Sequence, residues 1–172
     1  MAMTEQQLDG QVAIVTGSGR GIGKAIAQAY AKAGAAVCCA ARTVAEIQVT
    51  VQEIQAAGGR ALAVPTDVTL VPAVEHMVQA AVGVFGGLDI LVINAGAGGE
   101  RNNVEESDPE RWCKTLELNL FGAYYCARAA IPALKKRGGG KIITFSKGED
   151  TVQCSTCGSP SPDVSGALAD ML

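Results

Sequence analysis

The sequence has little of what metal sites and membrane spans require. It contains a single histidine, His76, and a single Cys-x-x-Cys pair, Cys154 and Cys157. A tetrahedral zinc site needs four ligands, so we expect no metal site and interpret the six cysteines as free thiols of a reducing compartment. No apolar run approaches the roughly 20 residues that cross a bilayer, and residues 1–10 have no apolar signal core. These absences favour a cytoplasmic protein without a membrane partner.

The chain also lacks an excess of positive charge. Its formal net charge is −3. Residues 147–172 carry one lysine and four acidic residues, so residues 1–146 have equal numbers of basic and acidic side chains. Surfaces that bind nucleic acids are generally basic. We therefore predict no nucleic-acid partner.

Apolar runs alternate with segments of helical periodicity along most of the chain. The predicted strands are residues 11–16, 35–41, 61–65, 88–93 and 141–145. The predicted helices are residues 21–34, 44–57, 71–85 and a long segment that begins at Asp108 and runs to about residue 135. Strands that are apolar on both faces and separated by helices indicate a parallel sheet covered on both sides. The prediction is therefore an α/β fold with a doubly wound parallel sheet of about five strands, in the order 3-2-1-4-5.

Residues 147–172 have a different character from the rest of the chain. They contain no aromatic residue and no sustained periodicity, and Ser, Pro, Cys and Gly cluster at 154–162. We predict a folded domain over residues 1–146, followed by an irregular, disordered tail over residues 147–172.

A glycine-rich turn joins the first predicted strand to the first predicted helix. Glycines there let the backbone turn sharply and let a pyrophosphate approach, and the helix N-terminus offers N–H groups and partial positive charge to the anion. A turn without a ligand is the alternative. The predicted phosphate-binding residues are Thr16, Gly17, Ser18, Gly19, Arg20, Gly21, Ile22 and Gly23.

Four motifs in this order resemble the short-chain dehydrogenases/reductases, over residues 8–145. They are the Thr-Gly-x-x-x-Gly-Ile-Gly turn, Asp67 with Val68, the triplet Asn94, Ala95 and Gly96, and Asn119. The resemblance implies a Rossmann-type nicotinamide-dinucleotide domain. It implies that Asp67 contacts the adenine, that the triplet supports the sheet beside the cofactor, and that Asn119 holds a water in a proton relay. Alternatively, Asp67 is a turn residue and Asn119 a buried amide bonded to backbone.

The end of the second predicted strand bears on cofactor choice. A carboxylate there binds the ribose 2′-OH of NAD, whereas an arginine pairs with the 2′-phosphate of NADP. Arg42 occupies this region, and Arg20 in the turn can reach the same phosphate. We predict NADP(H) as the cofactor. The alternative is that Arg42 is a solvated residue at a helix start.

The resemblance also implies hydride transfer to or from a small-molecule carbonyl or alcohol. The family uses a Tyr-x-x-x-Lys pair with a preceding Ser, and this sequence contains no Tyr-x-x-x-Lys. Ser146 stands one position before the expected Ser, where a one-residue slip in a strand turns the side chain to the other face. We therefore expect a form truncated before the Tyr-x-x-x-Lys motif and inactive, with Asn119 and Ser146 as its remaining candidate catalytic residues.

Other functions stay open at this point. The chain could be a catalytically silent nucleotide-binding or interaction module, or a non-functional truncated product. A methyltransferase-type domain is less consistent with the glycine spacing. The fifth predicted strand would form a sheet edge with unpaired N–H and C=O groups, so self-association through this strand is also expected.

Overall fold

The computed structural model describes residues 7–99 and 102–145 of the chain. Ser146 and the tail predicted over residues 147–172 lie outside these residues. The first half alternates strands and helices: β1 (Val12–Thr16), α1 (Gly21–Lys32), β2 (Ala36–Ala41), α2 (Val44–Ala56), β3 (Arg60–Pro65), α3 (Val71–Phe85) and β4 (Ile90–Ile93). The second half contains a short 3-10 turn, η1 (Val104–Glu106), followed by α4 (Pro109–Leu116), η2 (Glu117–Phe121), α5 (Gly122–Lys136) and β5 (Lys141–Thr144).

The five strands form one parallel sheet in the order β3-β2-β1-β4-β5. The predicted class and strand order are therefore confirmed. In the register, Ala13 on β1 stands opposite Val37 on β2 and opposite Ile90 on β4. The chain moves outward from β1 in both directions, so the strand order reverses between β1 and β4.

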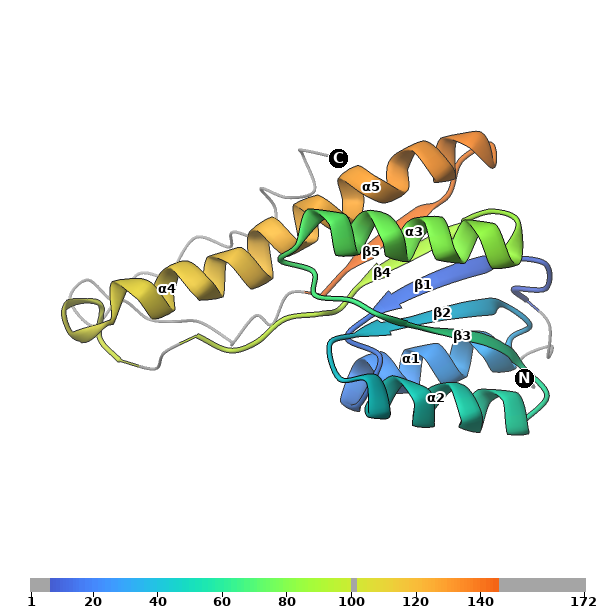
Figure 1. The fold of residues 1–172 in the computed structure, drawn as a ribbon, viewed down its shortest axis with the longest axis horizontal. Helices are drawn as coiled ribbons and strands as arrows, with labels where there is room; N and C mark the ends of the chain where they lie inside the picture. The colour runs from blue at the N-terminus through green and yellow to red at the C-terminus, as the bar shows by residue number, and fades with distance from the viewer. Residues whose placement is uncertain (1–6, 100–101, 146–172) are drawn as a thin grey trace.

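Helices cover both faces of the sheet, as Figure 1 shows with α1 and α2 on one side and α3 and α5 on the other. Successive side chains of a strand point to opposite faces. Accordingly, Val15 and Val37 pack in the core cluster under α1 and α2, whereas Ile14 and Leu91 pack in the cluster under α3 and α5. Strands β1 and β2 are apolar at almost every position because both of their faces are buried.

The long helix predicted from Asp108 is divided in the structure. Asp108 caps α4 as expected, since its Oδ1 accepts a hydrogen bond of 2.9 Å from the Glu110 N–H. Between α4 and α5, however, η2 forms a π-helical turn in which the Gly122 N–H donates to the carbonyl of Glu117. α5 then continues through Pro132 to Lys136. None of the residues of α4 is buried, and Figure 1 shows this helix extending beyond the sheet.

A polar clamp joins three segments at the amino ends of the central strands. Asp89 accepts hydrogen bonds from the Val12 N–H (2.9 Å, at Oδ2) and from Arg137 Nε (3.0 Å, at Oδ1). Arg137 also donates to the carbonyl of Gly10 at 3.0 Å. The clamp ties the starts of β1 and β4 to the end of α5, at the edge opposite the carboxyl ends of the strands.

Candidate functional site

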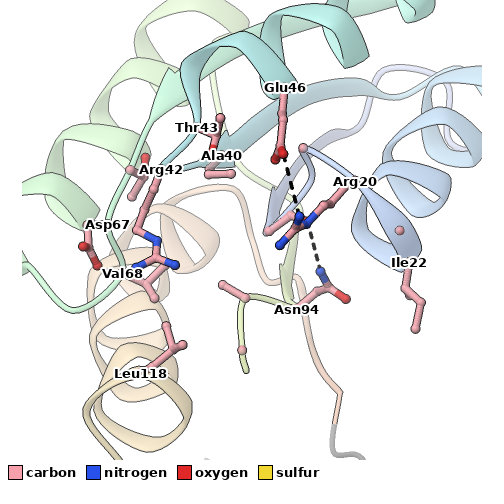
Figure 2. A pocket seen from close by; sticks show the side chains of 17 residues that line it. Arg20, Ile22, Ala40, Arg42, Thr43, Glu46, Asp67, Val68, Asn94 and Leu118 are labelled. Carbon is pink, nitrogen blue, oxygen red and sulfur yellow. Dashed lines mark hydrogen bonds and ion pairs between the residues drawn. The ribbon is translucent and has the colours of Figure 1, made fainter. Parts of the chain in front are cut away.

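A cleft of about 360 Å³ opens at the carboxyl ends of the strands, next to the point where the strand order reverses. Ligands of open α/β sheets generally bind at such a position. Figure 2 shows the side chains that surround the cleft. They come from the turn after β1, the start of α1, the end of β2, the first turn of α2, the segments that follow β3 and β4, and η2.

The glycine-rich turn brings the backbone of β1 and α1 close to the segment after β4. Gly17 has a φ of +67°, and a Cβ there would lie 2.9 Å from Asn94 Nδ2. A Cβ on Gly23 would overlap the carbonyl oxygen of Gly17. Arg20 is the N-cap of α1 and makes no side-chain cap hydrogen bond, and the first turn carries no acidic residue. This helix N-terminus therefore fits an anion such as the pyrophosphate of a dinucleotide.

The hydroxyl of Thr16 links β1 to the end of β4. It accepts hydrogen bonds from the N–H groups of Asn94 and Ala95, both at 3.0 Å, and donates to the carbonyl of Val92 at 3.3 Å. The Asn94 side chain also bonds to β1 and the turn: its Nδ2 donates to the carbonyls of Thr16 (3.0 Å) and Gly17 (3.4 Å). These bonds fix the glycine-rich turn to the Asn94–Gly96 segment, so the two motifs form one structural unit.

Two arginines reach the cleft from different elements. Arg42 follows β2, is exposed, and extends in Figure 2 toward the side where Asp67 and Val68 lie. Arg20 projects from the glycine-rich turn, and its guanidinium lies 4.0 Å from the carboxylate of Glu46. The cleft therefore holds two cationic groups and the carboxylates of Asp67 and Glu46.

Asp67 shapes its own turn as well as lining the cleft. Its Oδ1 accepts hydrogen bonds from the Thr69 N–H (3.0 Å) and from the Thr69 hydroxyl (2.8 Å). The interpretation of Asp67 as a turn residue therefore describes part of its role. Val68 is buried and packs against Gly122, where a Cβ would lie 2.8 Å from Val68 Cγ2.

Asn119 lies in the π-helical turn and not on the cleft wall. Its amide makes two hydrogen bonds with Ala97, accepting from the N–H at 3.0 Å and donating to the carbonyl at 2.9 Å. A Cβ on Gly96 would lie 2.9 Å from Asn119 Oδ1. Asn119 therefore positions the segment that follows the Asn94–Gly96 triplet.

The structure brings most of the predicted cofactor residues together around the cleft. Those that line it are Gly17, Gly19, Arg20, Gly21, Ile22, Arg42, Asp67, Val68, Asn94, Ala95 and Gly96. Thr16, Ser18 and Gly23 lie behind the wall and are buried.

Other lining residues were not predicted, among them Thr43 and Glu46. Thr43 is the N-cap of α2, and the Thr-x-x-Glu pattern of residues 43–46 is a helix-start signal visible in the sequence. A further residue that sequence analysis did not identify is Thr50, which is fully buried on α2. Its hydroxyl lies 3.0 Å from the carbonyl of Ser18, within the glycine-rich turn.

None of the four cysteines in the described part of the chain lines the cleft. Burial raises the pKa of the Cys39 thiol to about 11, although a hydrogen bond with Ser18 opposes the shift. Within residues 7–99 and 102–145, no group of three or more His, Cys, Asp or Glu side chains could hold a metal ion. In the same part of the chain, no helix is both long and apolar enough to cross a membrane.

Comparison with known proteins gives consistent matches along this region. The family model for the short chain dehydrogenases matches residues 11–154. The short-chain reductase protein NovJ of Streptomyces niveus is 42% identical over 135 residues, which cover 78% of this chain and 51% of that protein. The chain spans about half the length of the curated relatives that it matches.

Solved structures agree in fold. A 7α-hydroxysteroid dehydrogenase complexed with NADH and 7-oxo glycochenodeoxycholic acid superimposes with a TM-score of 0.79 at 34% identity, covering 85% of this chain and 58% of that one. A metagenomic short-chain oxidoreductase in complex with NADP superimposes with a TM-score of 0.78 at 36% identity, covering 83% and 64%.

The matched residues contain the whole sheet, the glycine-rich turn and the Asn94–Gly96 segment. The chain therefore belongs to the short chain dehydrogenase family.

Proposed function

We propose that this chain is the NADP(H)-binding part of an oxidoreductase that transfers a hydride to or from a small-molecule carbonyl or alcohol. The observation that carries the proposal is the cleft itself. One space at the carboxyl ends of the strands is surrounded by a glycine-rich turn, a helix N-terminus without a side-chain cap, and two arginines. Larger residues at Gly17 or Gly23 of this turn would clash with their neighbours. A dinucleotide needs these features for its pyrophosphate and ribose groups.

The preference for NADP(H) over NAD(H) rests on Arg42 and Arg20. The last residues of β2 are Ala40 and Ala41, so no carboxylate stands there to bind a ribose 2′-OH. A charge-assisted hydrogen bond contributes roughly 1.5–3 kcal/mol, and the exposure of both arginines reduces this value. Structures similar to this chain carry NADH in one case and NADP in another, so the preference has to be measured.

The remaining residue assignments belong to the same proposal. Asp67 would contact the adenine end, and Thr16, Asn94 and Asn119 would hold the backbone that faces the nicotinamide end. The bound nicotinamide would supply or accept the hydride. Because the 172-residue sequence contains no Tyr-x-x-x-Lys, we expect these 172 residues to bind the cofactor without turnover. Ser146 lies outside the described residues.

Fluorescence titration with NADPH and NADH tests the proposal. We expect saturable NADPH binding that is tighter than NADH binding, and Arg42→Met should weaken NADPH binding by about five- to tenfold with a smaller effect on NADH. Lys136→Met, which removes a cation at the far end of α5, is the matched control. Equal or tighter NADH binding would refute the cofactor preference, and failure to bind either dinucleotide would refute the proposed function.

We also propose that residues 1–146 suffice for cofactor binding. A variant that ends at residue 146 should bind NADPH with the same Kd as the full chain. A loss of affinity greater than about threefold, roughly 0.7 kcal/mol, would place part of the site beyond residue 146.

Self-association through β5 is proposed on its hydrogen-bonding pattern. Among the described residues, β5 pairs with β4 alone. The N–H groups of Lys141 and Phe145 donate toward β4, to the carbonyls of Asp89 (2.9 Å) and Ile93 (3.3 Å). Alternation along a strand then directs the N–H groups of Ile142 and Thr144 to the other side, where a second chain could pair. Light scattering over a concentration series should give a mass that rises with concentration.

A further inference from the structure

An acidic side chain lies in the part of the cleft that the proposed function assigns to phosphate. Glu46 is in the first turn of α2 and lines the cleft together with Arg20 and Arg42. The pattern Thr43-x-x-Glu46 usually forms a capping box, in which the two residues bond each other's backbone N–H groups. Thr43 makes no side-chain cap hydrogen bond here, and the Glu46 carboxylate faces Arg20 instead.

The position of Glu46 is fixed by its surroundings. A Cβ added to Gly19 would lie 2.8 Å from both Glu46 Cβ and Glu46 Oε2, so the carboxylate rests directly over the glycine-rich turn. Four residues along the same helix, the hydroxyl of the buried Thr50 lies 3.0 Å from the carbonyl of Ser18 in the turn and 3.1 Å from the carbonyl of Glu46 itself. The Glu46 side chain is 38% exposed, whereas that of Arg20 is 87% exposed. The Glu46 carboxylate is thus the more restrained member of the pair, and the Arg20 side chain has more freedom to move.

We propose that Glu46 is a specificity-determining residue that competes with the cofactor 2′-phosphate for Arg20. Arg20 pairs with Glu46 at 4.0 Å, as Figure 2 shows by the dashed line between them. A bound 2′-phosphate offers Arg20 a more highly charged partner, but the arginine must leave Glu46 to reach it. Glu46 therefore lowers the advantage of NADP(H) over NAD(H), since NAD(H) has no phosphate to exchange for the carboxylate. This inference rests on the proposed function.

The experiment measures Kd for NADPH and NADH by fluorescence titration in the full chain and its variants at low ionic strength. We expect Glu46→Gln to raise the NADPH-to-NADH affinity ratio about two- to fivefold, as the loss of one exposed ion pair allows. Higher salt should reduce this gain. Glu53→Gln is the matched control. Glu53 also lies on α2 and pairs with a lysine, Lys24, at 2.7 Å, but it does not line the cleft.

A double-variant cycle separates action through Arg20 from direct repulsion of the phosphate. With Arg20→Gln already present, Glu46→Gln should have less than half of its effect on the affinity ratio. An equal effect in both backgrounds, an unchanged ratio in Glu46→Gln, or the same change in Glu53→Gln would overturn the proposal. If the unaltered chain binds neither dinucleotide, the proposed function fails. If it binds NADPH and only the Glu46 effect is missing, this inference alone fails.

Discussion

At the scale of single residues, the turn between β1 and α1 depends on the absence of side chains at Gly17 and Gly23. Gly17 and Gly23 face each other across the turn, and Asn94 lies against both. A side chain on either glycine would meet the Asn94 amide, and one on Gly23 would also meet the backbone of Gly17, so neither position accepts a larger residue without a shift of the turn.

Gly23→Ala should therefore damage both the fold and the site. The new methyl group overlaps the carbonyl oxygen of Gly17, so we expect a loss of about 1–3 kcal/mol in the free energy of unfolding and no measurable NADPH binding. Urea denaturation and titration with NADPH measure the two effects. Gly83→Ala on α3 is the control, because a Cβ there has nothing within 4 Å. It should raise stability by up to about 1 kcal/mol. A Gly23→Ala variant that binds NADPH normally would contradict this account.

The buried hydroxyl of Thr50 gives a second prediction. Thr50→Val keeps the shape of the side chain but leaves the carbonyl of Ser18 without this donor, so the free energy of unfolding should fall by about 1 kcal/mol. Thr115→Val is a suitable comparison, since the Thr115 hydroxyl bonds the carbonyl four residues earlier, at 2.9 Å, on an exposed helix. Equal effects of the two substitutions in urea denaturation would mean that the bond to the turn contributes nothing.

The sequence was sufficient to predict the glycine-rich turn but not all of its neighbours. Residues 16–23 form a local motif whose spacing carries the information. Glu46 and Thr50 act because α2 folds back against that turn, and this contact joins segments about 30 residues apart. The sequence signals Glu46 only as part of a helix start and does not signal Thr50 at all, so the contact of either residue with the turn is not apparent until the helix has been placed.

At the scale of elements, the strands were the most predictable part of the fold. Their apolar runs reflect burial on both faces, and parallel connections leave few topologies to consider. The division of the long helix was not predictable in this way. Asn119 bonds the backbone of Ala97, 22 residues away, and Gly122 packs against Val68. These tertiary contacts accompany the π-helical turn, and helical periodicity alone does not signal it.

The clamp between β1, β4 and α5 should stabilise the end of the sheet. Arg137→Met removes the bonds to Asp89 and Gly10 and should cost about 1 kcal/mol of unfolding free energy. Asp89→Ala should cost more, because the Val12 N–H then also loses its acceptor. Thermal denaturation of both variants beside Lys141→Met, which changes an exposed lysine, measures this order. A larger loss in Arg137→Met than in Asp89→Ala would reverse the interpretation.

At the scale of the whole molecule, the buried thiols make stability depend on alkaline pH. Burial, with a contribution from the neighbouring Cys39, raises the pKa of Cys38 to about 12, and burial raises that of Cys126 to about 12. Unfolded thiols ionise near their ordinary value of 9.0. Above that pH the unfolded state releases protons that the folded state keeps, so stability present below pH 9 is lost as pH rises toward the folded values.

We expect the unfolding free energy to fall by about 1 kcal/mol for each buried thiol between roughly pH 8 and 10. Urea denaturation at the two pH values measures the loss. Cys126→Ala should show a smaller loss than the unaltered chain, because it lacks one buried thiol. All other ionisable groups are the same in the two chains, so the difference in loss belongs to Cys126. Identical losses would show that this thiol does not contribute.

Two proline substitutions in and next to β5 test the proposed pairing between chains. Thr144→Pro removes an N–H that points away from β4, so it should lower the mass measured by light scattering while leaving stability nearly unchanged. Phe145→Pro removes the N–H that donates to Ile93, so it should lower stability. A concentration-independent monomeric mass for the unaltered chain would rule out association through this edge.

The hydroxyl of Thr16 has a consequence for the order in which the molecule is made. β1, α1, β2, α2 and β3 are all synthesised before Asn94 and Ala95, the two residues whose N–H groups that hydroxyl accepts. The ribosome therefore adds about 70 residues after the glycine-rich turn before it makes Asn94 and Ala95, whose backbone bonds hold the turn in place. We expect ribosome-bound chains to capture NADPH only after residues 94–96 have emerged, and binding by shorter nascent chains would show that the turn is formed by its own local sequence.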